Sequence, residues 1–125
     1  MKPIYTKNAP EPIGPYSQAI QAGNFVFVSG QVGKDPVSGA MKNENIKTEA
    51  TQVMMNVKNV LEAAGLKMSQ IVKTTIFLTN MDDFGQVNEV YGSFFTGNYP
   101  ARETVQVSRL PLNANIEISV IAGVE

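Results

Sequence analysis

The sequence predicts an α+β fold in which two helices cover one face of a single β-sheet. Three observations support this prediction. Five short runs are rich in β-branched and aromatic residues, two longer segments repeat apolar residues at helical spacing, and the 125-residue length suits one domain spanning residues 1–125. The predicted order is β-β-α-β-α-β-β. Because an apolar helix stripe needs an apolar partner, we expect both helices to pack on the same sheet face.

The N-terminal quarter of the chain predicts a loop followed by a β-hairpin. Residues 8–17 (NAPEPIGPYS) are dense in Pro and Gly and are expected to form an ordered loop or an extended arm. In SQAIQAGNFVFVSG (17–30), a short strand leads into a turn at residues 22–24, and a second strand covers residues 25–30. Residues 34–39 (KDPVSG) then predict another loop.

Two helices and one strand are predicted in the middle of the chain. The first helix covers residues 46–64, and Gly65 follows it as a left-handed C-cap. Residues 71–79 (IVKTTIFLT) are too short and too β-branched for a further helix and predict a strand. Asn80 or Asp82 caps the second helix, which is expected to end at Gly97 and to place this apolar stripe in the core: Phe84, Val87, Tyr91, Phe94 and Phe95.

Residues 98–123 predict two strands joined through RLPLNAN, and each strand carries one charge of interest. Alternation places Ile116 and Ile118 on one face of the last strand and Glu117 on the other. In the preceding strand, Val105 lies opposite Arg102. By this parity, Arg102 and Glu117 are expected on the face that the helices leave uncovered, near opposite ends of paired strands.

The uncovered sheet face is expected to be half polar and half apolar. Such a face is poorly suited to water alone, and packing against further copies of the same sheet is the simpler explanation. Charged residues make up only 17% of the chain, which fits a molecule that hides part of its surface. The sequence therefore predicts a homo-oligomer.

Composition excludes several classes of function. The net charge of −1 without a basic run argues against nucleic acid as the main partner. The chain has neither cysteine nor histidine, so thiol nucleophiles, histidine triads, disulfides and zinc fingers are excluded. No apolar leader or membrane-spanning run occurs in the sequence, and we expect a cytoplasmic protein without membrane contact.

Arg102 and Glu117 have two interpretations that the residues alone leave open. Most Arg–Glu pairs on neighbouring strands are structural ion pairs, and this one would then join strands or subunits. Alternatively, the guanidinium binds the carboxylate of a small acid in bidentate fashion while the glutamate positions a water molecule.

Several motifs taken together resemble the Rid family, the reactive-intermediate (enamine/imine) deaminases once called YjgF proteins. They are IGPYSQA (13–19), VSGQVG (28–33), VNEVY (87–91) and YPAR (99–102) followed by IEIS (116–119). The resemblance implies a chorismate-mutase-like fold in a barrel-like homotrimer with sites between subunits. It also implies hydrolysis of 2-aminoacrylate and related 2-imino acids, unstable products of pyridoxal-phosphate enzymes, to 2-keto acids and ammonia without cofactor or metal.

The resemblance also implies roles for seven residues. Arg102 matches the arginine that binds the substrate carboxylate, and Glu117 matches the glutamate that holds the attacking water. The residues that match the cleft lining are Tyr16, Ser29, Gly30, Asn88 and Thr104. Four of these five have a structural alternative as well: loop packing for the tyrosine, a strand end for the Ser-Gly pair and solvated helix surface for the asparagine.

Two positions depart from the family pattern, and both bear on substrate preference. Glu103 follows the arginine where a small residue is usual, and alternation predicts that it points away from Arg102. Thr104 stands where well-known members carry cysteine, at a position whose main chain contacts the ligand.

Three functions follow from these residues. Apolar neighbours are expected to raise the pKa of Glu117 toward neutrality, which suits a general base in hydrolytic deamination. The same arginine would also serve a module that binds small 2-keto acids without turnover. Other family members have been described as endoribonucleases or translation inhibitors, an interpretation that we rank last because the basic stripe is missing.

Overall fold

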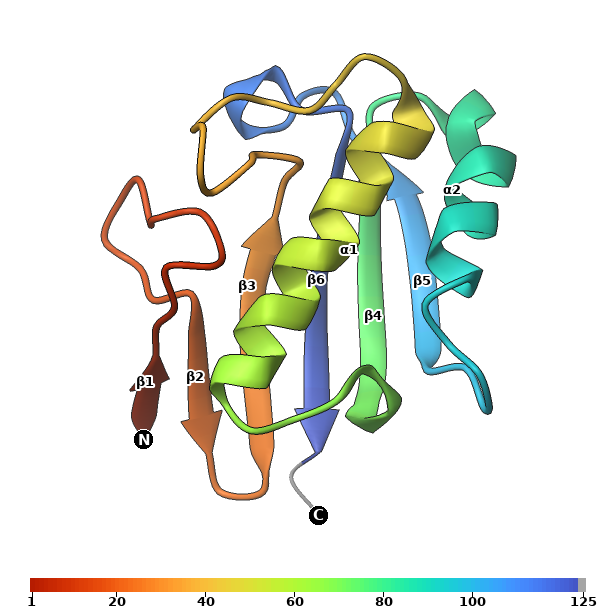
Figure 1. The fold of residues 1–125 in the computed structure, drawn as a ribbon. Coiled ribbons are helices and arrows are strands. Elements are labelled where there is room, and N and C mark those ends of the chain that lie inside the picture. The colour runs from red at the N-terminus through yellow and green to blue at the C-terminus, as the bar shows by residue number, and fades with distance from the viewer. Residues whose placement is uncertain (124–125) are drawn as a thin grey trace.

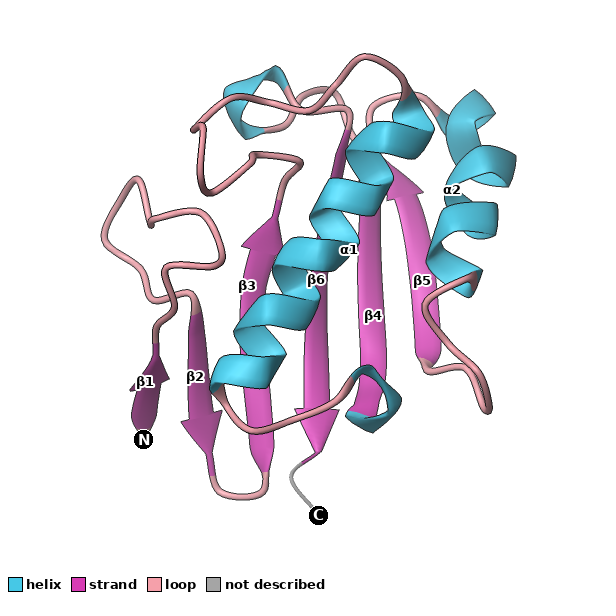
Figure 2. Cartoon of the chain, in the orientation of Figure 1, coloured by secondary structure: helices cyan, strands magenta, loops and turns pink. Residues whose placement is uncertain are grey.

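The computed structural model describes residues 1–123 and confirms the predicted succession of strands and helices (Figures 1 and 2). One strand was missed, the short β1 at the N-terminus. None of the helices in residues 1–123 is long and apolar enough to cross a membrane. The elements are β1 (Lys2–Ile4), β2 (Ala19–Ala22), β3 (Phe25–Gln31), α1 (Ile46–Ala63), β4 (Ile71–Leu78), α2 (Phe84–Gly92), β5 (Ala101–Gln106) and β6 (Ile116–Gly123), with 3₁₀ turns at Met68–Gln70, Met81–Asp83 and Pro111–Asn113.

The strands form one six-stranded sheet in the order β1-β2-β3-β6-β4-β5. Both helices lie on the same face, as predicted (Figure 1). The expected pairing of the last two strands is wrong, because β4 lies between β5 and β6 and pairs with both. The chain leaves β4, crosses over through α2 and returns in the same direction, so β5 adds to the sheet as the parallel neighbour of β4.

The hairpin and the first helix form as the sequence predicts. Antiparallel β2 and β3 meet at a turn in which Gly23 has φ 60°, a conformation that residues other than glycine rarely adopt. The Asn45 side chain accepts a hydrogen bond from the Thr48 backbone at the start of α1. Gly65, with φ 78°, follows the last turn.

The second helix is shorter than predicted. The Asn80 side chain caps the 3₁₀ turn at Met81–Asp83, and α2 then ends at Gly92 rather than continuing to Gly97. Beyond it, the Phe94 and Phe95 backbones close tighter turns by bonding three residues back. Both rings still pack against the core.

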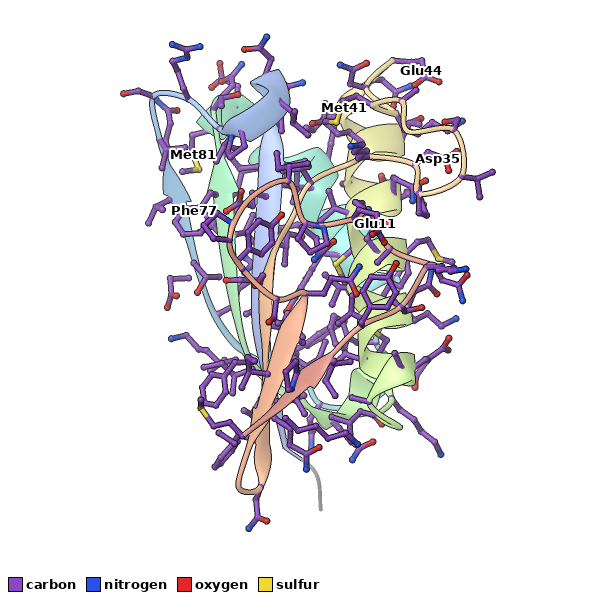
Figure 3. All side chains as sticks on the ribbon, turned by 90° about the vertical axis from the view of Figure 1, so that its left-hand side faces the viewer. Glu11, Asp35, Met41, Glu44, Phe77 and Met81 are labelled. Atoms are coloured by element: carbon purple, nitrogen blue, oxygen red, sulfur yellow. The ribbon has the colours of Figure 1, made fainter. Side chains whose placement is uncertain are left out.

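The core fills the space between the helices and one sheet face, and the other face remains open. Alternate residues of β6 are fully or almost fully buried beneath α1, and the face that they share is the one predicted from alternation. Figure 3 shows Phe77 on the opposite side of the sheet from α1. Several large apolar side chains of the open face are exposed: Phe25, Phe27, Val72 and Val105. The open face is therefore apolar enough for the packing between copies that the sequence predicts.

Arg102 and Glu117 do not share a sheet face, contrary to the prediction. Arg102 lies beside Thr74, which is fully buried and accepts a hydrogen bond from the Tyr91 hydroxyl on α2. Arg102 therefore faces the helices. Glu117 lies beside Phe77 and faces the open side. The edge strand β5 meets the rim of α2 rather than the centre of the core, so its polar residues are tolerated on the helix side while Val105 faces outward.

Candidate active site

Four of the predicted site residues line one pocket of about 350 Å³ at the end of β3. Its walls come from the N-terminal loop, from the end of β3, from the Pro111–Asn113 turn and from β6. The structure therefore brings together residues that are up to 107 positions apart in the sequence, Pro10 and Glu117. The predicted residues in this lining are Tyr16, Ser29, Gly30 and Glu117.

The carboxylate of Glu117 is half-buried and unpaired. Within residues 1–123 it forms no hydrogen bond and no ion pair. Removal from water without a compensating partner raises the pKa of Glu117 above its usual 4.5, in the direction that the sequence predicts. A carboxyl group in this state accepts a proton more readily than an ordinary surface glutamate, which suits a general base.

Gly30 makes the space that this carboxylate occupies. A Cβ atom at position 30 would lie 2.5 Å from Oε2 of Glu117, well inside van der Waals contact. The pairing of β3 with β6 shifts register between Val28 and Gln31, and such a bulge turns a strand locally. A side chain at position 30 would therefore displace the Glu117 carboxylate, so Gly30 has a role beyond ending a strand.

Hydrogen bonds fix the N-terminal loop that closes one side of the pocket. The buried Gln18 side chain accepts from the Thr6 backbone at 2.7 Å and donates to the carbonyls of Thr6 and Pro10 at 3.0 and 2.9 Å. Ser29 Oγ donates to the Ser17 carbonyl at 2.6 Å. This wall of the pocket is accordingly built into the folded chain before any ligand arrives.

Arg102 lies in a second pocket, of about 430 Å³, between β5 and the end of α2. Its Nη1 donates to Asn88 Oδ1 at 2.7 Å, and its guanidinium carbon lies 5.5 Å and 5.2 Å from the ring centroids of Phe84 and Tyr91. Helix α2 thus supplies an amide and two aromatic faces that orient the cation. Contrary to the sequence-based expectation that Phe84 lies in the core, it is 37% exposed and lies against the guanidinium.

The two pockets are separate within one chain. Their linings share no residue, and they lie on opposite faces of the sheet. Arg102 pairs with Thr74 and Glu117 with Phe77, so their backbones are two strands and three residues apart, on the order of 14 Å. A molecule the size of a three- or four-carbon acid cannot touch both groups of the same chain.

Glu103 and Thr104 follow Arg102 on β5. Glu103 points away from Arg102, as predicted, but this direction is the open face, because Arg102 faces the helices. Glu103 binds Lys73 at 3.1 Å and Thr75 Oγ1 at 2.5 Å. The hydrogen bond from Thr75, followed by that from Lys73, lowers the pKa of Glu103. Thr104 lines neither pocket, and its buried hydroxyl has no hydrogen-bond partner within residues 1–123.

This architecture is that of a small α+β protein of the YjgF type. The solved structure of the Escherichia coli YjgF gene product matches with a TM-score of 0.96 and 44% identity, covering 100% of both chains. The chain belongs to the Rid (YjgF) family. The family model described as Endoribonuclease L-PSP matches residues 6–124.

Relatives at similar identity carry different names. A RutC family protein of Pyrococcus horikoshii is 50% identical over 95% of this chain and 94% of its own. A Mus musculus protein named 2-iminobutanoate/2-iminopropanoate deaminase is 46% identical over 97% of this chain and 90% of its own.

Proposed function

We propose that this protein is a homotrimeric deaminase that hydrolyses 2-iminobutanoate, 2-iminopropanoate and its enamine tautomer 2-aminoacrylate to 2-keto acids and ammonia. Each site lies in a cleft between two subunits. One subunit supplies Arg102 and Asn88, and the next supplies Glu117 with its pocket. The observation that carries the proposal is that an oriented cation and an unpaired carboxylate occupy separate open pockets on opposite sheet faces.

The position of the two half-sites supports an assembly. Neither pocket holds both the group that binds a carboxylate and the group that accepts a proton. The open face of the sheet carries exposed Phe25 and Phe27, which favour contact with another copy. A cyclic arrangement repeats the same contact around the ring, so the Arg102 pocket of each chain meets the Glu117 pocket of its neighbour.

In the proposed reaction, Arg102 binds the carboxylate of the 2-imino acid through two N–H donors. The iminium carbon is already electrophilic and needs a positioned water rather than a metal. Glu117 takes a proton from that water as its oxygen bonds to carbon, giving a carbinolamine. The carboxyl group returns the proton to the nitrogen, and the C–N bond breaks as the carbon–oxygen double bond forms. Glu117 accepts the hydroxyl proton released in that step and passes it to the departing ammonia, which leaves as ammonium. The net change is iminium plus water to ketone plus ammonium.

The remaining predicted residues position these groups. Asn88 orients the guanidinium, Gly30 gives Glu117 its space, and Tyr16 and Ser29 form the walls beside it. We assign the main chain at Thr104, on the strand that carries Arg102, to ligand contact, which leaves its side chain free to vary. Holding water and iminium in near-attack geometry lowers the barrier by several kcal/mol, about 7–11 at best.

A coupled assay tests the activity. A serine or threonine dehydratase generates 2-aminoacrylate, and the rate of keto-acid formation is compared with the spontaneous rate. Arg102→Ala and Glu117→Gln should each lower kcat/KM by about 100-fold or more. The matched controls are Arg109→Ala and Glu44→Gln, both at exposed positions outside the pockets. Parental rates in Arg102→Ala, or no acceleration by the parent, would refute the proposal.

Subunit mixing tests whether the site is shared. Arg102→Ala and Glu117→Gln subunits carry complementary intact halves, so mixed trimers should regain activity that neither variant has alone. Random mixing of equal amounts in a cyclic trimer restores about a quarter of the interfaces. Activity that stays at background in verified mixed trimers would mean that each chain works alone.

Two other functions would give different results. A module that only binds 2-keto acids would retain them without accelerating hydrolysis, and Glu117→Gln would change neither property. The family model's description names an endoribonuclease, yet acidic residues outnumber basic ones by 11 to 10 in this chain and histidine is missing. RNA binding that weakens steeply with added salt would favour that function.

A further inference from the structure

The turn that closes the Glu117 pocket is strained. Leu112 and Asn113 both have positive φ, at 59° and 53°. A leucine in the left-handed region is uncommon because its Cβ approaches the following carbonyl oxygen. Such strain persists only where surrounding contacts hold it, and it concentrates at functional sites.

A buried carboxylate holds this turn in place. Glu49, in the first turn of α1, is fully buried. Its Oε2 accepts from the Asn115 backbone at 2.7 Å, and its Oε1 accepts from Asn115 Nδ2 at 2.8 Å. Gly33 leaves room for it, since a Cβ there would lie 2.8 Å from Glu49 Cγ. Burying a carboxylate is costly, and within residues 1–123 this one is bonded only to Asn115. We infer that the cost is tolerated because these bonds fix the position of the adjacent turn.

The turn presents an apolar side chain to the pocket. Leu112 is 44% exposed and Ile13, on the N-terminal loop, is 60% exposed, and both line the pocket that contains Glu117. Exposure of two large aliphatic side chains in one concave site marks a surface for an apolar group.

We propose that Leu112, held by the Glu49–Asn115 clamp, is a specificity-determining residue that receives the aliphatic side chain of the substrate. The inference deepens the proposed function and rests on it. Glu117 and Ser29 serve the reacting end of the 2-imino acid, whereas Leu112 and Ile13 contact the carbons beyond it. The pocket of about 350 Å³ exceeds the needs of a three-carbon acid, so longer aliphatic chains gain contact as they lengthen.

Truncation of the leucine tests this role. For Leu112→Ala, kcat/KM for the imine of a branched five- or six-carbon 2-keto acid should fall about tenfold, because contacts to one or two methylenes are lost. The value for 2-iminopropanoate, which does not reach the side chain, should stay within about twofold. Met55→Ala, at a 37% exposed position of α1, is the control and should change neither value. Equal changes for short and long substrates would overturn the assignment.

The clamp gives an independent test. Glu49→Gln keeps one acceptor for Asn115 but puts an amide where Oε1 or Oε2 accepted. Because Glu49 acts as a positioning residue, the Glu49→Gln variant should raise KM for the long substrate while kcat for 2-iminopropanoate remains near the parental value. A general loss of kcat for both substrates, with a parental KM ratio, would assign Glu49 to stability alone. Leu112→Asn, which tolerates positive φ, covers the case in which Glu49→Gln does not fold.

Calorimetric binding separates a failure of this inference from a failure of the proposed function. The probes are pyruvate and 4-methyl-2-oxopentanoate, which need no turnover. The parent should bind the longer acid more tightly, and Leu112→Ala should remove that preference while pyruvate affinity is retained. If the parent turns over imines but shows no preference that depends on Leu112, only the inference fails. If the parent neither binds keto acids nor accelerates hydrolysis, the function fails first.

Discussion

Gly30 and Glu117 lie side by side on neighbouring strands, and the lack of a side chain at Gly30 leaves room for the Glu117 carboxylate. Among residues 1–123 the half-buried carboxylate has no partner, and a Cβ atom at Gly30 would displace it. The sequence suggested a raised pKa for Glu117 from its apolar neighbours. It contained no sign of the contact with Gly30, because that contact depends on the register of β3 against β6.

The pH dependence of the rate should report Glu117. A general base works in its charged form, so kcat/KM should fall as acid protonates it. Since burial raises the pKa of Glu117, the midpoint of this fall should lie above pH 4.5. Rates of keto-acid formation measured from about pH 4 to 8, and corrected for spontaneous hydrolysis, locate the midpoint. Glu117→Gln should remove that acid limb from whatever rate remains, and an unchanged limb would exclude Glu117 as the base.

Gly30→Ala should lower activity far more than stability. The new methyl group displaces the Glu117 carboxylate, and a misplaced base costs about 10- to 100-fold in kcat. Gly85→Ala is the matched control, because a methyl group added there would meet nothing within 4 Å, and the residue sits in helix α2. The control should keep its activity and unfold at the same or a higher temperature. Parental activity in Gly30→Ala would contradict the packing argument.

At the scale of elements, α2 is both a core helix and a support for Arg102. Val87 and Tyr91 are buried, while Asn88 and Phe84 contact the guanidinium from the same helix. The helical periodicity correctly predicted that Val87 and Tyr91 are buried, but it wrongly placed Phe84 with them. It did not reveal the aromatic support for the cation, because an apolar stripe looks the same whether it packs on a sheet or under a guanidinium.

Asn88→Ala should weaken binding more than chemistry. Loss of the acceptor at 2.7 Å frees the guanidinium to rotate, so the affinity for 2-ketobutyrate should fall about tenfold. Changes in kcat at saturating substrate should be smaller. Calorimetry and saturation kinetics give the two values, and Gln86→Ala, an exposed neighbour on α2, is the control. A fall confined to kcat would place Asn88 at the reacting carbon instead.

Local pattern predicted the elements well but not their neighbours. Hairpin β2–β3, helix α1 and strand β4 lie within about a residue or two of the predicted bounds, because turn residues, caps and periodicity depend on the local sequence. The pairing partner of β5 does not depend on the local sequence. Alternation in residues 101–106 suits either neighbour, and only the crossover through α2 selects β4. The error about the face of Arg102 has a different cause: alternation placed Val105 on the core side, whereas Val105 of this edge strand faces outward.

At the scale of the molecule, the open sheet face is expected to set both assembly and activity. If the proposed trimer forms through this face, Phe27→Asp, which places a charge among exposed apolar side chains, should produce monomers that keep their circular dichroism but lose the proposed deaminase activity. Sedimentation velocity measures the mass, and Val37→Asp on an exposed loop is the control. Active monomers would show that one chain suffices.

The separation of Arg102 from Glu117 by the thickness of a sheet has a consequence for dosage. For a site built from two chains, total activity rises more steeply than the protein concentration over the range in which the subunits assemble. Dilution should therefore silence the protein at concentrations where every chain is still folded. In a cell, the amount synthesised would act as a threshold on the reaction.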